Sequence, residues 1–474
     1  MSSMTKTAKP NARLREVGLG CLLAITLSGC MTVGPNYQEP ELAISQQWQT
    51  TVPRDTKEIS LEHWWEQFND PSLVVLIQAA LADNPSLDKA VASISSARAT
   101  LASVKSGFAP SLDGSANAQR SRQQQSNMIS TQTSRAAGFD ASWELDLFGK
   151  VRRSAEAAQA RLQARVNDWH EARVSLAAEV ADTYAQYRAC LLLIDAYGEQ
   201  LVSTEKTAQA TEASVQAGLT SRANGSLARA GLASTQSSLQ AQRVQRDLLV
   251  KSLVALTGMD EARLRDRLGE GGKALPQPTA FRVATVPADV LRQRPDVASL
   301  ERELAAASAS IGAAQADLYP SLSLSGSVSV SASSLASGIT SWSFGPALSI
   351  PLFDGGKRRA AMASAEADYQ GAQAAWRQGV RDAVKEVEQA LVNLDGIAYR
   401  SERAALAAQE YRAYFEATEV RWRTGGASLL TLEETRRSAL SSQIESITLQ
   451  RDQVRYWVAL YKAVGGGWTP TAVE

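Results

Sequence analysis

The stretch RPDVASLERELAAASASIGAAQADLYPSLSLSGS, residues 294–327, repeats an earlier stretch of the same chain. Its counterpart is NPSLDKAVASISSARATLASVKSGFAPSLDGSA, residues 84–116. The two prolines of each copy have the same spacing, from Pro85 to Pro110 and from Pro295 to Pro320. Because this spacing is kept over the whole stretch, we interpret the fold as one structural unit used twice.

The agreement between the copies continues further along the chain. SWELDLFGK, which starts at Ser142, corresponds to LSIPLFDGGK, which starts at Leu348. We therefore predict repeat 1 over 84–260 and repeat 2 over 294–465. The other segments are an N-terminal region over 30–83, a linker over 261–293 and a tail over 466–474. A unit of about 200 residues is too long for a solenoid repeat and suits one half of a pseudo-symmetric domain.

The N-terminus has the pattern of an export signal. Basic residues between Lys6 and Arg15 precede a short apolar run over 17–27, which is too short to cross a bilayer as a helix. The run ends in Leu-Ser-Gly followed by Cys30, as in bacterial lipoproteins. We predict a signal peptide over 1–29 and a covalent lipid such as palmitate on Cys30, with an ordinary signal peptide as the alternative. Met31, in place of an aspartate, favours the outer membrane.

The composition excludes several classes of protein. The chain has 49 basic and 49 acidic residues and no polybasic tract, so we expect no nucleic-acid partner. After Cys30 no apolar run reaches the ~18 residues of a membrane-spanning helix. Cys190 is the other cysteine left after cleavage, and because Cys30 would carry lipid we expect no disulfide. The surroundings of Cys190 are rich in Ala and Leu and indicate a packing role.

Two stretches have the composition of very long helices. Proline is absent from Ser111 to Leu275, which permits an uninterrupted helix. We predict long helices over 150–217 and 357–424, each about 100 Å long at 1.5 Å per residue. Shorter helices are predicted over about 86–107, 222–257, 296–317 and 428–463. A coiled-coil seam is indicated by one row of Val380, Val387 and Leu394 and a second row of Val384, Leu391 and Ala398.

Between the first short helix and the long helix, each repeat has residues that alternate with a period of two. The strands are expected within about 110–147 and 320–352, ahead of helices within about 150–257 and 357–463. Phe139 and Trp143 alternate with Asp140, Glu144 and Asp146, and the apolar residues of 320–352 alternate with serines. This pattern is typical of membrane strands of about ten residues with one face in lipid and one in water. The alternative is a pair of soluble hairpins on a core.

Four strands are too few to close a membrane barrel, since the smallest have about eight. An open sheet edge is not tolerated in lipid, because its backbone groups would lack hydrogen-bond partners. We therefore expect several copies to pool their strands: two copies would supply eight strands and three would supply twelve.

At this point the residues resemble a known family, the outer-membrane efflux factors (TolC-like proteins), in their NodT-type lipoprotein branch. The resemblance rests on VGPNYQEP after Cys30, HWWEQFNDPSL from His63, SWELDLFGK, the stretch from Val290 to Ser327, and IPLFDGGKRR. It implies an α+β membrane protein that forms a homotrimer. A twelve-stranded β-barrel would continue into an α-helical coiled-coil tunnel with an equatorial collar. Such proteins are passive exit ducts of multidrug efflux systems, and they dock a periplasmic adaptor and an inner-membrane pump, here of the proton-driven RND type.

In this family the tunnel closes where its helices turn, at the periplasmic end. The resemblance places these turns at 218–224 and 425–434 and implies that Gly218, Gly425 and Gly426 form the tips that meet the adaptor. It implies roles in the closed gate for Leu430 (apolar constriction), Glu434 (acidic ring), Arg437 (basic position) and Trp422 (aromatic position). The alternative for Glu434 is a role in capping the last helix within 431–434.

Asn224 is the residue of the first turn where an aspartate is frequent in the family. Because Asn224 is neutral, we expect at most a neutral hydrogen bond there. The two repeats differ most at these turns. We therefore expect the gate there, where the repeats are not alike.

The sequence gives little support for enzymatic chemistry. His63 and His170 are its two histidines, and we expect no catalytic residue, no metal site and no cofactor other than the lipid. Three alternatives to a small-molecule efflux duct remain open. Two are ducts for type I protein secretion or for metal efflux, and the third, of another class, is a non-pore coiled-coil lipoprotein. The period-two strands favour a duct.

Overall fold

The protein is described by a computed structural model over residues 32–41, 48–50, 61–125, 128–270, 272–276, 291–334 and 336–468. The predicted signal peptide and Cys30 lie outside these residues, as do parts of the predicted collar and tail. The chain divides into two compact units. The sheet unit takes residues up to Pro40, Ser93–Arg165 and Leu300–Trp376, and the helical unit takes Glu41–Ala92, Val166–Ser299 and Arg377–Glu474.

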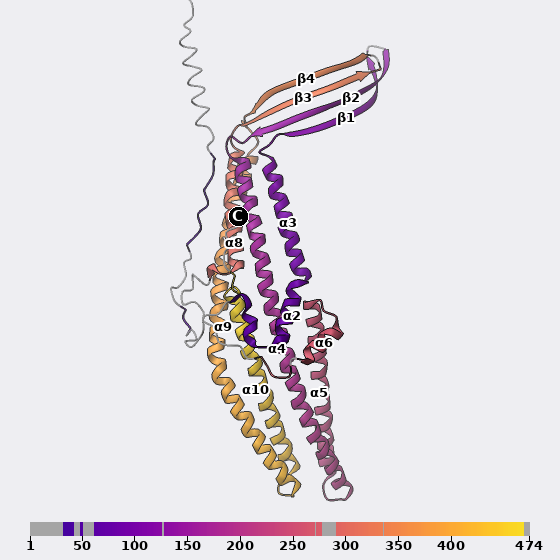
Figure 1. The fold of residues 1–474 in the computed structure, drawn as a ribbon, viewed down its shortest axis with the longest axis vertical. Coiled ribbons are helices and arrows are strands. Elements are labelled where there is room, and N and C mark those ends of the chain that lie inside the picture. Colours follow the sequence, from indigo (N-terminus) through magenta and orange to yellow (C-terminus); the bar gives the residue numbers. More distant parts are fainter. Residues whose placement is uncertain are drawn as a thin grey trace, which may run out of the picture. The chain divides into compact units, whose positions relative to one another are not determined.

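The described elements follow the order of the duplication (Figure 1). The elements before and within the first repeat are η1 (Leu61–Phe68), α2 (Pro71–Ala82), α3 (Pro85–Ser106), β1 (Ser111–Gln125), β2 (Met128–Leu145), α4 (Lys150–Gln216) and α5 (Arg222–Thr257). The later elements are α6 (Glu261–Glu270), α8 (Pro295–Ala316), β3 (Ser321–Ser333), β4 (Ala336–Ser349), α9 (Lys357–Arg423) and α10 (Leu429–Ala463).

The four strands form one antiparallel sheet in the order β1-β2-β3-β4 (Figure 1). The strands of the two repeats are joined directly, since β2 pairs with β3 from Leu145↔Leu322 to Ser134↔Ser333. The strands have 13 to 18 residues, so the predicted length of about ten was too short. Asp146 was predicted on the polar face of a strand, which was wrong: it accepts hydrogen bonds from the backbone N–H of Val151 and Arg152 at the start of α4.

The register gives the sheet two chemically different faces. On one face, Phe139 lies opposite Val328, which lies opposite Trp342, and Trp342 is 79% exposed. On the other, Asp140 lies opposite Ser327, and Ser327 opposite Ser343, with 2.9 Å between the two hydroxyl oxygens. We call these the apolar face and the polar face. A soluble hairpin would bury its apolar face on a core, so the broad exposure here fits a lipid contact.

The long helices α4 and α9 each run for 67 residues without a break. In α9 the predicted row of Val380, Val387 and Leu394 is buried. The second predicted row is correct at Leu391 but wrong at its end, because Ala398 is exposed and Ile397 is buried in its place. The drift arises because an α-helix has 3.6 residues per turn and does not keep a strict seven-residue repeat over its whole length.

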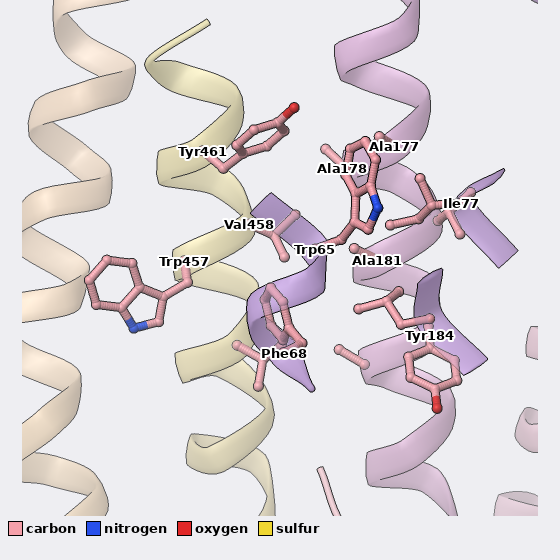
Figure 2. Packing of buried hydrophobic residues seen from close by; sticks show 14 of the residues in the cluster. Trp65, Phe68, Ile77, Ala177, Ala178, Ala181, Tyr184, Trp457, Val458 and Tyr461 are labelled. Atoms are coloured by element: carbon pink, nitrogen blue, oxygen red, sulfur yellow. The ribbon is translucent and has the colours of Figure 1, made fainter. Parts of the chain in front are cut away.

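The core of the helical unit is built around aromatic residues from η1 (Figure 2). Trp65 and Phe68 lie among residues of α4 and α10, including Ala181 and Val458. Trp64 stacks on Tyr461, with 4.2 Å between the ring centroids. The small residues of α4 leave room for these rings, so the short elements before repeat 1 fill the space beside the long helix.

A buried polar cluster ties α2 to α4. The Asp70 carboxylate caps α2 by accepting from the backbone N–H of Ser72 and Leu73. It also accepts from the Tyr184 hydroxyl at 2.7 Å and lies 3.3 Å from the Arg188 guanidinium. Burial and the hydrogen bond to Asp70 raise the pKa of Tyr184, which therefore remains a protonated donor. One carboxylate thus fixes a helix start, a tyrosine and an arginine in the core.

We predict that Asp70→Asn lowers the free energy of unfolding by about 3 kcal/mol, because the amide can still cap α2 but leaves the buried Arg188 charge without its carboxylate. Tyr184→Phe should cost only about 1 kcal/mol, since it removes one hydrogen bond and keeps the ring. The measurement is thermal unfolding of the purified chain followed by helical circular dichroism. Equal midpoints for wild type and Asp70→Asn would contradict the role given to this carboxylate.

Candidate functional site

The first helix turn, between α4 and α5, is held by local hydrogen bonds. Gly218 has φ +71°, a conformation that suits glycine, and its N–H bonds the carbonyl of Val215. Ser221 caps α5 by accepting from the N–H of Asn224. The Asn224 amide donates to the Thr220 hydroxyl at 2.8 Å, so in this structure Asn224 supports the turn itself.

An ion pair joins the two helices beside this turn. Arg229 of α5 lies 2.7 Å from the Glu212 carboxylate of α4, and both side chains are well exposed. A charged contact therefore exists near the first turn, beside Asn224, for which only a neutral hydrogen bond was expected. Because both groups face water, the pair contributes only about 0–1 kcal/mol.

The second turn, between α9 and α10, is built in the same way. Gly425 has φ +80°, as predicted for a turn glycine, and the N–H of Gly426 bonds the Arg421 carbonyl at 2.7 Å. Ser428 caps α10 by accepting from the N–H of Thr431 at 3.1 Å. The alternative prediction of a capping role for Glu434 was therefore wrong, because α10 begins earlier and Ser428 takes that role.

The predicted gate residues divide into two groups. Leu430 is 57% exposed, and the Glu434 and Arg437 side chains are also exposed. Neither charged side chain has a hydrogen bond or ion pair with another residue in the described ranges. Trp422 behaves differently, since it is half-buried against a small cluster that includes Leu429 and Leu432. Leu430, Glu434 and Arg437 thus remain available for contacts outside the single chain.

Arg436 is the residue that the sequence did not single out. Its side chain is 3% exposed and donates to the Thr207 hydroxyl of α4 at 2.7 Å. It also forms an ion pair with Glu433 and lies over the Phe415 ring, 5.4 Å from its centroid. One guanidinium therefore connects α10 to both α4 and α9. The signal was helical periodicity, because position 436 continues the buried row of Leu429 and Leu432.

A groove of about 750 Å³ lies beside Arg436, between α4, α9 and α10. Gln200 and Ser203 line it from α4, and Phe415 and Glu419 line it from α9. The Ser203 hydroxyl donates to the Glu419 carboxylate at 3.1 Å. Charged side chains such as Glu419 and Arg436 share the walls of the groove with apolar ones such as Phe415 and Leu440.

The polar face of the sheet carries three carboxylates. Asp113 of β1 lies directly opposite Asp140 of β2, and Glu144 follows on the same face of β2. Two like charges opposite each other in a sheet are unfavourable unless water screens them. This face therefore suits an aqueous surface and would attract cations.

The start of the described chain packs against the end of the sheet. The N–H of Val33 bonds the Phe148 carbonyl at 3.1 Å. Arg153 of α4 donates to the Val33 carbonyl at 3.1 Å and to the Asn36 side chain at 2.8 Å. Gly34 lies against Gly312 of α8 with no room for a side chain, since a Cβ there would be 2.3 Å from the Gly312 Cα. The segment after Cys30 is thus fixed beside the junction of β2 and α4.

The remaining candidates have structural roles. Cys190 is buried as predicted, and burial raises the pKa of its thiol to about 11, so it stays protonated. Arg294 pairs with Asp296 at 2.7 Å and Glu386 at 2.8 Å, a network at the start of α8. His170 is half-buried beside Trp169 and Trp468. Across the described ranges no group of three His, Cys, Asp or Glu residues could hold a metal ion.

None of the helices that the structure describes is both long enough and apolar enough to cross a membrane.

Comparison with known proteins decides the family. The model described as outer membrane efflux protein matches residues 76–259 and 286–466. The chain belongs to the outer membrane efflux protein family. It is similar to the solvent efflux pump outer membrane protein SrpC of Pseudomonas putida, with 32% identity over 468 residues that cover 94% of this chain and 97% of that protein.

Two further members of the family extend the comparison. Nodulation protein T of Rhizobium leguminosarum bv. trifolii is 29% identical over 461 residues, which cover 95% of this chain and 97% of that protein. The solved structure of the outer-membrane channel OprN has a TM-score of 0.79 and 31% identity, over 92% of this chain and all of that one. The predicted subunit fold and the predicted family of outer-membrane efflux proteins are confirmed.

We predict that Arg436→Ala loosens α10 from α4, because it leaves Glu433 without its cation and removes the bond to Thr207. A buried pair broken in this way costs about 3 kcal/mol. Hydrogen–deuterium exchange over residues 429–440 should therefore speed up by on the order of a hundredfold if exchange follows this local stability. Glu445→Ala, which removes an exposed charge elsewhere on α10, is the control and should leave exchange unchanged. Equal exchange in both variants would contradict the role of Arg436.

Proposed function

We propose that this chain forms the passive outer-membrane exit duct of a tripartite efflux pump and works as a homotrimer. The observation that carries the proposal is the two-faced four-stranded sheet, whose edge strands β1 and β4 each have one neighbour in the described chain. In lipid, an unpaired edge costs several kcal/mol for each unsatisfied backbone group. Three copies supply twelve strands, and pairing of β4 with β1 of the next copy satisfies every edge.

The charge and face pattern explain what such a duct would do. The apolar face meets lipid, and the polar face, with Asp113, Asp140 and Glu144, lines a water-filled lumen. No step of the proposed activity forms or breaks a covalent bond, so the chain acts as a conduit and not as an enzyme. Energy would come from an inner-membrane pump, of the proton-driven type, linked through a periplasmic adaptor protein.

The exported compounds are proposed to be small molecules, such as drugs or organic solvents. Support comes from the solvent efflux relative, which is similar over nearly the whole of both chains. A duct for protein secretion or for metal ions would use the same fold, but no feature of the described residues favours either. A coiled-coil spacer without a pore is disfavoured, because it would have no use for an exposed apolar sheet face beside a charged polar one.

The lipid anchor on Cys30 is proposed to sit at the periplasmic border of the membrane. The support is the packing of the following residues, since Val33 and Gly34 are fixed by Arg153 beside the end of β2. A chain advances at most about 3.6 Å per residue, so a lipid attached three residues before Val33 would lie close to that border. The anchor and the sheet would then enter the bilayer together.

The adaptor is proposed to dock at the two helix turns, whose tips are Gly218, Gly425 and Gly426. All three glycines are exposed, and the groove beside Arg436 opens next to the second turn. The closed gate is proposed to form where Leu430 and Glu434 of three copies approach one axis. Arg436 would hold α10 on α4 in each subunit, so opening requires α10 to leave these contacts.

A planar bilayer recording tests the duct directly. The purified full-length protein should insert and give single channels of reproducible conductance. A coiled-coil spacer would give none, and that result would overturn the proposal.

We expect Leu430→Ala and Glu434→Ala to loosen the closed gate, because one removes the apolar constriction and the other the acidic ring. Both should raise the resting conductance several-fold in bilayers and make cells more sensitive to vancomycin, which normally crosses the outer membrane poorly. Glu410→Ala, an exposed carboxylate elsewhere on α9, is the matched control. If conductance and vancomycin sensitivity stay at the wild-type level in both gate variants, these residues do not form the constriction.

The lumen proposal predicts cation selectivity. Asp113→Asn with Asp140→Asn removes two directly opposed carboxylates from the polar face and keeps their size. The reversal potential in a tenfold salt gradient should move toward zero, with the larger change at low ionic strength, where charges are less screened. An unchanged reversal potential at low salt would show that these carboxylates do not face the ion path.

A further inference from the structure

The charged residues of the sheet are completely sorted between its two faces. The strands contain six charged residues, all in β1 and β2. By the register, the three acids Asp113, Asp140 and Glu144 share the polar face, and the three arginines Arg120, Arg122 and Arg135 share the apolar face. A water-filled lumen accounts for the three acids, because water solvates their charges. The arginines need a different explanation, because they stand on the face that otherwise carries Phe139, Val328 and Trp342.

The arginines form one patch at one level of the sheet. Ala118 pairs with Arg135, so Arg120 is the diagonal neighbour of Arg135, and Arg122 follows two residues later on the same strand. Neighbours of this kind have α carbons about 7–8 Å apart, within reach of three long side chains. All three side chains are exposed, and none has a hydrogen bond or ion pair with another residue in the described ranges. We call these three residues the arginine patch.

The patch begins where the apolar band ends. On β2 the apolar face runs from Leu145 through Phe139 to Ala137, and Arg135 is the next residue on that face. The eight steps from Leu145 to Ala137, at about 3.3 Å each, span about 26 Å along the strand. At the usual tilt of about 40° this is roughly 20 Å of height, comparable with the ~25 Å lipid-facing band of membrane strands. The near end of the band joins the helices, so the patch lies at the far end, toward the hairpin that connects β1 to β2.

We propose that the arginine patch binds the phosphate groups of lipid headgroups in the outer leaflet of the outer membrane. This inference rests on the proposed function, which puts the apolar face in lipid and the helices in the periplasm. Guanidinium groups bind phosphate oxygens through paired N–H donors, and they do so more strongly where water is partly excluded. The occupant is a lipid and not a soluble anion, because the patch is continuous with the apolar band that the acyl chains of the same lipid would cover.

The test uses full-length trimer in detergent, titrated with bis-phosphorylated lipid A and, separately, with lipid A from which both phosphates have been removed. Native mass spectrometry counts the bound lipids. The first variant, R120Q/R122Q/R135Q, neutralises the patch. The second adds Q119R, S121R and A136R to the first, which moves the three charges to matching positions on the polar face and keeps the net charge. Planar bilayer recording of each protein shows separately whether the duct is intact.

We expect wild type to bind phosphorylated lipid A on the order of a hundredfold more tightly than the dephosphorylated form, since each basic group near a lipid surface contributes about a factor of five. Both variants should lose this preference and still form channels. Millimolar inorganic phosphate should not displace the lipid from wild type, whereas displacement would assign the patch to a soluble anion and overturn the proposal.

Two other results would also overturn it. Equal binding of both lipids by wild type would show that phosphate is not recognised, and wild-type binding by the second variant would show that only net charge matters. If wild type forms no channels at all, the proposed function fails and not merely the lipid site, so the two failures are distinguishable.

Discussion

The backbone N–H and C=O groups on the outer edges of β1 and β4 have no partner strand in the described chain, although the sheet exposes a broad apolar face. Water satisfies such edges in a soluble protein, but hydrocarbon does not. This single constraint forces several copies to share one closed sheet. The remaining features follow from closure: one face must suit lipid, the other must suit water, and the helices that leave the sheet must surround one axis.

Because the chain is duplicated, closing the sheet between copies is compatible with a helical tunnel. Each chain supplies two strand pairs, joined through β2 and β3, and two long helices of equal length, α4 and α9. Three chains therefore provide six similar helical units. The two halves differ at their turns. Arg436 connects α10 to α4 and α9 from a buried position, whereas the ion pair beside the first turn, Arg229–Glu212, is exposed. This difference is the reason why the gate is proposed at the second turn.

Much of this architecture could be predicted from the sequence, because helix and strand periodicities and proline positions are local signals. The start of α4 at Lys150, the turn at Gly425 and the two faces of the sheet were all predicted correctly. Contacts between segments that are distant in the sequence were not predicted. The role of Arg436 depends on Thr207 and Phe415, which are distant in the sequence. The resemblance to the family pointed to the neighbouring residue Arg437, which is exposed. The helix cap at Ser428 was missed because two polar residues a few positions apart can each serve as a cap.

Disulfide cross-linking between copies tests the central claim most directly. Ser115→Cys on β1 would be combined with a single cysteine scanned over all of β4, positions 336–349, because barrel closure staggers the register between copies, in a chain whose buried Cys190 is replaced by serine. If three copies close one sheet, at least one pair should give a covalent ladder that ends at the trimer when membranes are oxidised. A ladder that ends at the dimer, or no cross-link at any position in membranes that contain the folded protein, would contradict the account.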